Sequence, residues 1–330
     1  MFREKWQKDF LVMFLIMGFI FILWDPGEAQ TKSRRVLSIG TGSTGGVFYV
    51  LGGGIAQVIS KHLPDTAASS EVTAGSQDNC RLIHAGKADL GLVAVDVGYD
   101  ALKGVDRFKS TGPIPLRAIA GIFSNYMHFI ASEGSGIKSI PDLKGRRVSV
   151  GQPGSGTEVM CMRVLDSYGL DPNKDLKPER LGALESAGAL KDRKIEAFAW
   201  SGGIPTAPIL DLAASPGIKI RVLKCDENID KIIKKYGPIC YKTVMPKNTY
   251  PHMDSDVEVV AVRKFLVCHE KMEADLVYKI LRVLLENQPE LVLVHREATN
   301  FTLAQATLDS PFLFHPGAIR YYQEKGIKIK

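Results

Sequence analysis

The sequence predicts an α/β protein with two similar lobes, each a mixed, mostly parallel sheet flanked by helices. From Arg34 onward, short β-branched runs alternate with amphipathic helical stretches. A unit of strand, Gly/Ser/Thr-rich loop and helix occurs twice, at residues 36–62 and 147–168. Extended runs near 123–131 and 255–267 would link the two blocks, and 330 residues suffice for two domains.

The first block is predicted to contain five strands and two helices. The strands are expected at 36–39, 70–73, 90–95, 116–122 and 128–131, and the helices at 47–62 and 79–85. The helix at 47–62 has the clearest pattern, because Phe48, Leu51 and Ile55 lie at helical spacing and Pro64 follows its end.

The second block continues the alternation. Strands are expected at 147–151, 197–200 and 218–223, and helical segments at 137–145, 158–168, 187–192, 209–214 and 229–236. A long extended run follows at 257–267, interrupted by Arg263 and Lys264, which we expect to contact water. The strongest helix is predicted at 273–286, with shorter ones around Leu303 and Ala318.

The N-terminus resembles an export signal. Arg3, Lys5 and Lys8 precede the uncharged run 10–24, and a polar stretch ending near Ala29 offers a small-residue cleavage site. Fifteen helical residues rise about 22 Å, short of the roughly 30 Å hydrocarbon core. We expect a signal peptide at 1–29 and a periplasmic mature protein; an uncleaved membrane anchor is the alternative.

Composition excludes several classes of protein. The chain is 45% hydrophobic and 24% charged, which is typical of globular proteins, and its basic residues are scattered, so we expect no nucleic-acid partner. The net charge of +6 would suit an anionic ligand. Five cysteines without a Cys-x-x-Cys or zinc-like spacing predict no metal site. Cys225 and Cys240 either pair or remain buried thiols.

The loop Gly40-Thr-Gly-Ser-Thr-Gly-Gly46, between a strand and a helix, matches G-x-G-x-x-G. A dinucleotide-dependent enzyme is therefore one hypothesis. Against it, the second strand runs into Thr73-Ala-Gly75 instead of an acidic residue that could bind a ribose hydroxyl, and an export signal directs the chain away from cytoplasmic dinucleotides. Backbone N–H groups and hydroxyls at a helix N-terminus nevertheless favour binding of an anion.

Three further loops follow predicted strands, at 75–79, 151–157 and 200–203. The loop at 151–157 lacks the Lys-Ser/Thr of a phosphate loop, and Pro153 replaces the first glycine of a nucleophile elbow. An ordinary tight turn with a helix cap would explain each loop alone. Four such loops at the ends of predicted strands indicate a ligand-binding site. A charge-assisted hydrogen bond contributes about 1.5–3 kcal/mol, whereas micromolar affinity needs about 8 kcal/mol, so several donors must converge.

No catalytic residues, cofactor or metal are expected. Seven histidines are scattered without a His-Glu-x-x-His motif or an obvious nucleophile–base pair. Asp96, after the third strand, either faces the cleft to receive a ligand amine or caps the next helix. Tyr49 and Trp200 either line a ligand site or pack in the core.

Several motifs in order carry a family resemblance over residues 34–326. They are 39–49 (IGTGSTGGVFY), 75–79 (GSQDN), 88–91 (ADLG) with Asp96, 136–145 (GIKSIPDLKG), 151–157 (GQPGSGT) and 315–322 (HPGAIRYY). The chain resembles the TAXI-type solute receptors of tripartite ATP-independent periplasmic (TRAP) transporters.

This resemblance implies a two-lobed type II periplasmic-binding-protein fold with a ligand cleft between the lobes. Lobe one would comprise 30–128 and 257–330, and lobe two 129–256. The protein would bind glutamate, 2-oxoglutarate or a related carboxylate as a monomer, and deliver it to membrane subunits driven by an ion gradient. A receptor of the same fold serving an ATP-driven (ABC) importer or a sensor kinase is the runner-up.

The resemblance also assigns ligand-binding residues. From lobe one it implies Ser43, Thr44, Gly45, Tyr49, Ser76 and Gln77, with Asp96 added from its position after a strand. From lobe two it implies Ser155, Gly156, Thr157, Trp200, Gly202 and Gly203. Trp200 departs from the family pattern, where a smaller or different residue is expected, so the resemblance does not fix the ligand's identity.

Overall fold

The computed structural model describes residues 34–308 and 310–329. The predicted signal peptide at 1–29, and the alternative of a membrane anchor, lie outside the described residues. Within them, no helix has both the length and the apolar character needed to cross a bilayer. The described residues from Arg35 onward form one compact unit.

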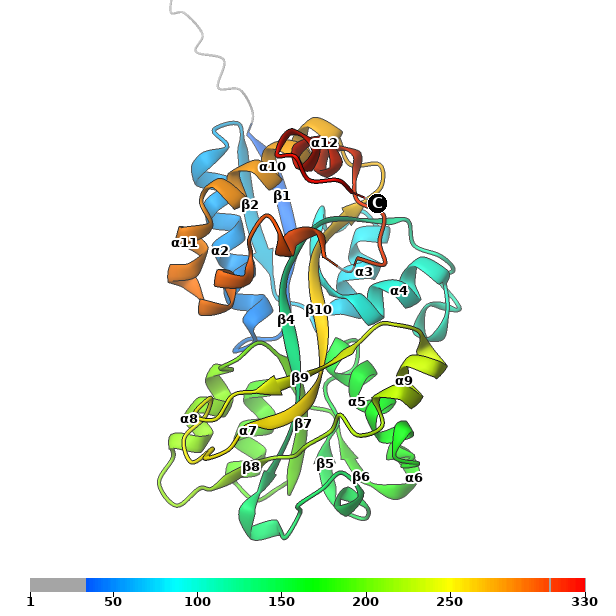
Figure 1. Ribbon diagram of the computed structural model, residues 1–330, viewed down its shortest axis with the longest axis vertical. Helices are drawn as coiled ribbons and strands as arrows, with labels where there is room; N and C mark the ends of the chain where they lie inside the picture. The colour runs from blue at the N-terminus through cyan, green and yellow to red at the C-terminus, as the bar shows by residue number, and fades with distance from the viewer. Residues whose placement is uncertain (1–33, 309, 330) are drawn as a thin grey trace, which may run out of the picture. The chain divides into compact units, whose positions relative to one another are not determined.

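A single mixed sheet runs through this unit, in the order β2-β1-β3-β10-β4-β7-β5-β6, with β8 beside β4 and β9 beside β10 (Figure 1). The strands are Arg35–Gly40 (β1), Thr66–Glu71 (β2), Leu90–Ala94 (β3), Leu116–Ser132 (β4), Arg147–Ser149 (β5), Lys177–Glu179 (β6), Ala197–Gly202 (β7), Ile220–Val222 (β8), Tyr241–Met245 (β9) and Val257–His269 (β10).

Two parallel groups flank a long antiparallel pair. β2, β1 and β3 are parallel to one another, as are β7, β5 and β6. Between them, β4 and β10 pair antiparallel along most of their length. All residues of β3 and β7 are buried, as expected for strands covered on both faces. The sheet is continuous through β4 and β10, so the lobe boundaries at 128/129 and 256/257 stay a prediction.

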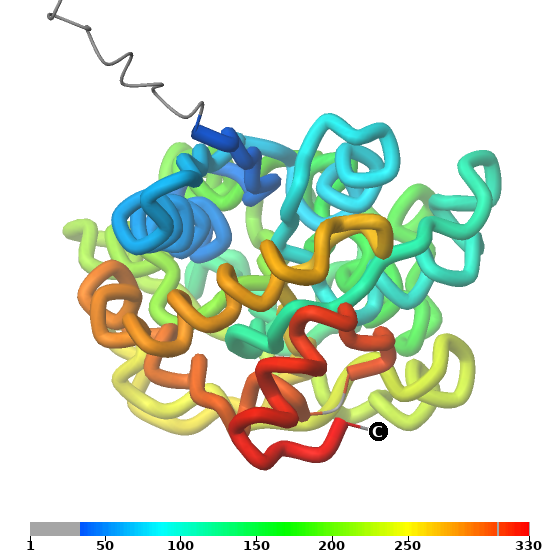
Figure 2. Tube along the Cα trace, turned by 90° about the horizontal axis from the view of Figure 1, so that it is seen from above, coloured from blue at the N-terminus to red at the C-terminus, as the bar shows by residue number. Residues whose placement is uncertain are grey.

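Helices cover both faces of each parallel group. The α-helices are Val47–His62 (α2), Ser76–His84 (α3), Val95–Lys103 (α4), Gly156–Ser167 (α5), Pro172–Asp175 (α6), Ala183–Lys191 (α7), Ala207–Ala214 (α8), Ile229–Tyr236 (α9), Ala274–Glu286 (α10), Gln288–Val294 (α11) and Pro316–Glu324 (α12). α10 packs against α2 and α12, and α11 packs against α2, as the view from above shows (Figure 2). The 3₁₀ turns are Asp106–Phe108, Glu133–Ser135, Pro141–Leu143, Arg296–Asn300 and Gln305–Thr307.

Some sequence predictions are corrected here. The runs 116–122 and 128–131 are one continuous strand, β4, because backbone pairing to β10 and β7 carries the chain through the polar residues Ser124 and Asn125. The second strand lies at Thr66–Glu71, earlier than predicted, because its small and polar residues give little hydrophobic signal. No helix forms around Leu303, which lies between two 3₁₀ turns.

The five cysteines are free and buried, which settles the choice between a disulfide and buried thiols. Burial raises the pKa values of both Cys225 and Cys240 to about 12. Both thiols are therefore protonated and unreactive near neutral pH.

Candidate functional site

A small cavity of about 40 Å³ lies where the carboxyl ends of β1, β2, β5 and β7 meet the middle of β4 and β10. Its lining residues are Gly42, Ser43, Gly46, Val47, Phe48, Ala74, Gly75, Ser76, Asn125, Ser155, Gly156, Thr157, Trp200, Ser201 and Lys264. Ligands of open α/β sheets bind at this end of the strands. This volume holds about three water molecules, so the loops around the cavity are closed upon one another.

The structure brings about half of the predicted ligand-binding residues to this cavity. Those that line it are Ser43, Ser76, Ser155, Gly156, Thr157 and Trp200. Those that do not are Thr44, Gly45, Tyr49, Gln77, Asp96, Gly202 and Gly203. Whether any of them touches a ligand stays a prediction.

Two of the glycine-rich loops contact each other directly. The backbone N–H of Gln77 donates to the Gly154 carbonyl at 3.1 Å, and its side-chain Nε2 donates to the Ser155 carbonyl at 3.0 Å. In return, Gln152 Nε2 donates to the Ala74 carbonyl at 3.0 Å. Gln77 therefore holds the two loops together at the cavity wall. Gly75, with φ +122°, adopts a conformation that side chains rarely allow, and a Cβ added to it would lie 3.7 Å from Ser155 Cα.

Three helices begin at the cavity: α2 after Gly46, α3 after Gly75 and α5 after Ser155. Helix N-termini carry partial positive charge and backbone N–H donors, so their convergence favours an anion. Two hydroxyls add to these donors. Ser76 Oγ accepts from Ala94 N at 3.0 Å and Thr157 Oγ1 accepts from Ser201 N at 3.1 Å, which leaves each hydroxyl proton available to donate.

Trp200 forms one wall of the cavity. Its indole Nε1 donates to Thr206 Oγ1 at 3.1 Å, which fixes the ring. Gly46 lies against the ring, where an added Cβ would be 3.2 Å from two ring carbons, and Gly202 leaves no room for a Cβ beside Nε1. Trp200 was expected either to line a ligand site or to pack in the core. Its ring lines the cavity and is also packed in the interior, with 9% of the residue exposed.

Sequence reasoning missed Lys264, which projects from the middle of β10. We expected it to contact water, but it is 2% exposed and lines the cavity. Among the described residues no hydrogen bond or ion pair to its Nζ is found, and this atom lies over the Phe48 ring, 5.6 Å from the ring centroid. Burial lowers the pKa of Lys264 from 10.5 to about 8, although the Asp96 carboxylate opposes this. At pH 7 the group is therefore a buried cation without a paired anion.

Asn125, in the middle of β4, was also missed. Its Nδ2 donates to the Ser201 carbonyl at 2.6 Å, which fixes the orientation of the amide because that carbonyl can only accept. The other amide atom, Oδ1, is buried and has no hydrogen-bond partner within the described part of the chain. A buried acceptor without a partner costs free energy unless a ligand or water satisfies it.

Asp96 is committed to another interaction. It lies in the first turn of α4, where its carboxylate pairs with Arg163 of α5 at 3.3 Å, and Arg163 also binds Asp100. Burial raises the pKa of Asp100 to about 6, against the lowering effect of Arg163. This buried cluster joins α4 to α5. Among the described residues, no group of three or more His, Cys, Asp or Glu side chains could hold a metal ion.

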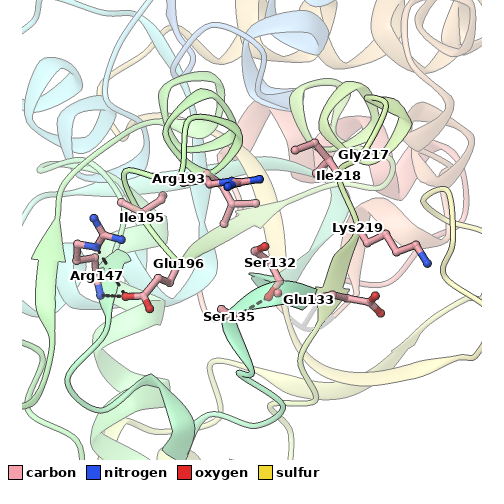
Figure 3. Close-up of a pocket in the computed structure, with 12 residues that line it drawn as sticks. Ser132, Glu133, Ser135, Arg147, Arg193, Ile195, Glu196, Gly217, Ile218 and Lys219 are labelled. Atoms are coloured by element: carbon pink, nitrogen blue, oxygen red, sulfur yellow. Dashed lines mark hydrogen bonds and ion pairs between the residues drawn. The ribbon is translucent and has the colours of Figure 1, made fainter.

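A larger hollow of about 760 Å³ lies elsewhere and is shown in Figure 3. It lies beside Arg147, the first residue of β5, and beside Glu196 and Lys219, which directly precede β7 and β8. This is the amino-terminal end of these strands, opposite to the end where open α/β sheets bind ligands. Arg147 Nε lies 3.7 Å from Glu196 Oε2. Figure 3 shows these two side chains facing each other. We therefore place the candidate site at the smaller cavity.

Comparison with solved structures identifies the fold. The alkanesulfonate-binding protein SsuA from Xanthomonas axonopodis pv. citri, bound to MOPS, is similar with a TM-score of 0.50 and 17% identity, over 89% of this chain and 91% of that one. A protein from Bordetella bronchiseptica is similar with a TM-score of 0.51 and 17% identity, over 88% and 83%. The predicted fold class is confirmed: this is an α/β fold of the type II periplasmic-binding-protein kind.

The family follows from the sequence itself. The model of the NMT1-like family matches residues 39–326, which include all four glycine-rich loops and both long strands of the candidate site. The chain therefore belongs to the NMT1-like family.

Proposed function

We propose that this protein is an extracytoplasmic solute receptor that closes around a small organic anion, a carboxylate, and delivers it to a membrane transporter. The observation that carries this proposal is Lys264, a buried cation without a counter-ion at a cavity where three helices begin. Buried charges in proteins are paired or bind a ligand, because an isolated one is costly. A ligand carboxylate would supply the missing anion.

Closure of the loops on the ligand gives the site enough donors for useful affinity. Lys264 and the hydroxyls of Ser76 and Thr157 come from three different elements, β10, α3 and α5. One charge-assisted hydrogen bond contributes about 1.5–3 kcal/mol, so three such bonds at the upper end of this range reach the roughly 8 kcal/mol of micromolar binding. The contacts of Gln77 with Gly154 and Ser155 support a closed state of this kind.

The arrangement supports binding rather than catalysis. His128 is buried, with Nε2 2.8 Å from Tyr250 Oη, and burial lowers its pKa to about 4. It does not line the cavity, and the cavity contains no carboxylate, histidine or cysteine among its described lining residues. The expectation that the second strand does not end at an acidic residue is wrong, because β2 ends at Glu71. Glu71 does not line the cavity, however, so the hypothesis of a dinucleotide-dependent enzyme gains no support.

The TAXI-like motifs favour a TRAP transporter, driven by an ion gradient, as the membrane partner, and a periplasmic location. An ABC importer or a sensor kinase is the alternative, because the same fold serves both. Uptake of the ligand by cells that carry the receptor and its membrane subunits separates these cases. TRAP-dependent uptake stops when the ion gradient is collapsed while ATP is maintained, whereas ABC-dependent uptake continues.

Replacement of Ser155 and Thr157 by alanine tests the site. Ser155 Oγ caps α5 by accepting from Glu158 N at 3.0 Å, and loss of such a cap costs about 1 kcal/mol of stability. We expect carboxylate affinity, measured by calorimetry, to fall at least tenfold in the double variant. Asp171→Ala, which removes the exposed cap of α6, is the matched control and should leave affinity unchanged. Unchanged affinity in the double variant would refute this site.

A further inference from the structure

We propose, on the basis of the function proposed above, that the anion carries a hydroxyl group and no ammonium group. The ligand class is then a small hydroxy carboxylate rather than an amino acid. The juxtaposition that points to this class is a buried lysine and a buried asparagine, whose amide oxygen is unpaired, among the lining residues of a cavity without acidic side chains.

The absence of acidic side chains argues against an amino acid. None of the described residues that line the cavity is Asp or Glu. The ammonium group of a bound amino acid would therefore be buried without a counter-charge, in the same small cavity as the ammonium group of Lys264. An unpaired buried charge is unfavourable, and the repulsion between two cations adds to this cost.

The acidic groups around Lys264 do not line the cavity. Asp96 contributes to the electrostatic environment of Lys264, but its Oδ2 pairs with Arg163 at 3.3 Å, and the residue is absent from the cavity wall, although its Oδ1 has no hydrogen-bond partner within the described part of the chain. Glu297 lines a separate hollow of about 200 Å³ that Lys264 also borders. Its Oε1 accepts from the backbone N–H of Ile204 at 2.8 Å, and Oε2 accepts from Asn300 at 3.0 Å. Neither carboxylate is positioned to receive a ligand amine in the cavity.

The amide oxygen of Asn125 argues for a hydroxyl. The Nδ2 of this amide is bound to the Ser201 carbonyl, so the atom left without a partner is the acceptor, Oδ1. A ligand hydroxyl would donate to it and could at the same time accept from Ser76 or Thr157. In place of the hydroxyl, an oxo acid offers only a hydrogen-bond acceptor, and a deoxy acid offers neither a donor nor an acceptor. Both would therefore leave Asn125 Oδ1 unpaired. A ligand that leaves a buried polar group of the site unpaired binds more weakly, so the site discriminates against that ligand.

The test is a calorimetric titration of the protein with matched acids of three and four carbons. The three-carbon set is lactate, alanine, pyruvate and propionate, and the four-carbon set is malate, aspartate, oxaloacetate and succinate, with both enantiomers of each chiral acid. In at least one set we expect the hydroxy acid to bind about tenfold to a hundredfold more tightly than the oxo and deoxy acids. The amino acid should bind at least a hundredfold more weakly than the hydroxy acid.

Asn125→Leu provides a second measurement that a purely structural role would not affect. The variant should bind the hydroxy acid and the deoxy acid with nearly equal affinity, because the acceptor that distinguishes them is gone. Asn173→Leu, at an exposed position of α6, is the matched control and should keep the preference of the wild-type protein.

Each outcome has a distinct meaning. If an amino, oxo or deoxy acid binds as tightly as the hydroxy acid of its set, the ligand class proposed here is overturned while the receptor function stands. If none of the carboxylates binds, the proposed receptor function itself fails. The wild-type series decides between these cases even if the Asn125 variant does not fold.

Discussion

Replacement of Lys264 by methionine should make the protein more stable and abolish its affinity for the anion. Methionine has a similar length and no charge, so it fills the same space beside Phe48. The stabilisation is expected because the protein holds the lysine as a buried cation in its ligand-free state. Residues that bind a ligand but destabilise the ligand-free protein produce a trade-off between stability and function.

The magnitude follows from the pKa. Burial lowers the pKa of Lys264 from 10.5 to about 8. At about 1.4 kcal/mol per pH unit, the buried charge costs about 3 kcal/mol at pH 7, where both the folded and the unfolded protein are protonated. From pH 8 to 10.5 the folded protein loses this proton first, so the free energy of unfolding rises with pH and the cost disappears.

The assay is urea unfolding of the ligand-free protein at pH 7, 8 and 9.5, followed by circular dichroism. We expect Lys264→Met to unfold with a free energy up to about 3 kcal/mol above the wild-type value at pH 7, with a smaller gap at pH 9.5. Lys234→Met, at an exposed position of α9, is the control and should change stability by less than about 0.5 kcal/mol. A loss of stability at pH 7 in Lys264→Met would mean that the lysine has a stabilising partner, and would contradict the assignment of Lys264 as an unpaired buried cation.

Three further predictions concern the same region. Affinity for the anion should be constant below pH 8 and should fall by up to tenfold per pH unit above the pKa of Lys264, because the free protein then loses the cation. Calorimetry between pH 6.5 and 9.5 measures this, and an affinity that does not change with pH would contradict it. Gly202→Ala should displace the adjacent indole and lower affinity at least tenfold, whereas Gly188→Ala, where a Cβ would meet nothing, should not weaken binding. Arg163→Met should leave two buried aspartates unpaired and lower the free energy of unfolding by about 3–5 kcal/mol, which chemical denaturation measures; a change below about 1 kcal/mol would show that the cluster contributes little.

Much of the fold could be predicted from local patterns. The helix at Val47–His62 and the helix at Ile229–Tyr236 have the predicted limits, because apolar residues at helical spacing mark the buried face. Strand β9, Tyr241–Met245, was not predicted, since it is polar and half-exposed, and only its pairing with β10 defines it. Pairing between distant segments is not visible in a single local pattern.

The loops around the cavity could be predicted, but two of the side chains that line it, Lys264 and Asn125, could not. Ser43, Ser76 and Thr157 follow strands in glycine-rich loops, a pattern that indicates a binding site at strand ends. Lys264 and Asn125 lie in the middle of strands instead, where a polar residue ordinarily indicates the solvent-facing side. Both faces of β10 are covered near Lys264. The alternation of polar and apolar residues along the strand could therefore not identify which polar residue faces a cavity.

The most direct test of the account is a calorimetric titration of wild-type protein and Lys264→Met at pH 7. Each is titrated with the tightest-binding carboxylate and with its neutral amide, which has nearly the same shape. We expect the wild-type protein to bind the carboxylate at least a hundredfold more tightly than the amide, and the variant to lose this preference. Equal affinity of the wild-type protein for acid and amide, or full retention of the preference in the variant, would contradict the claim that Lys264 binds an anion in this cavity.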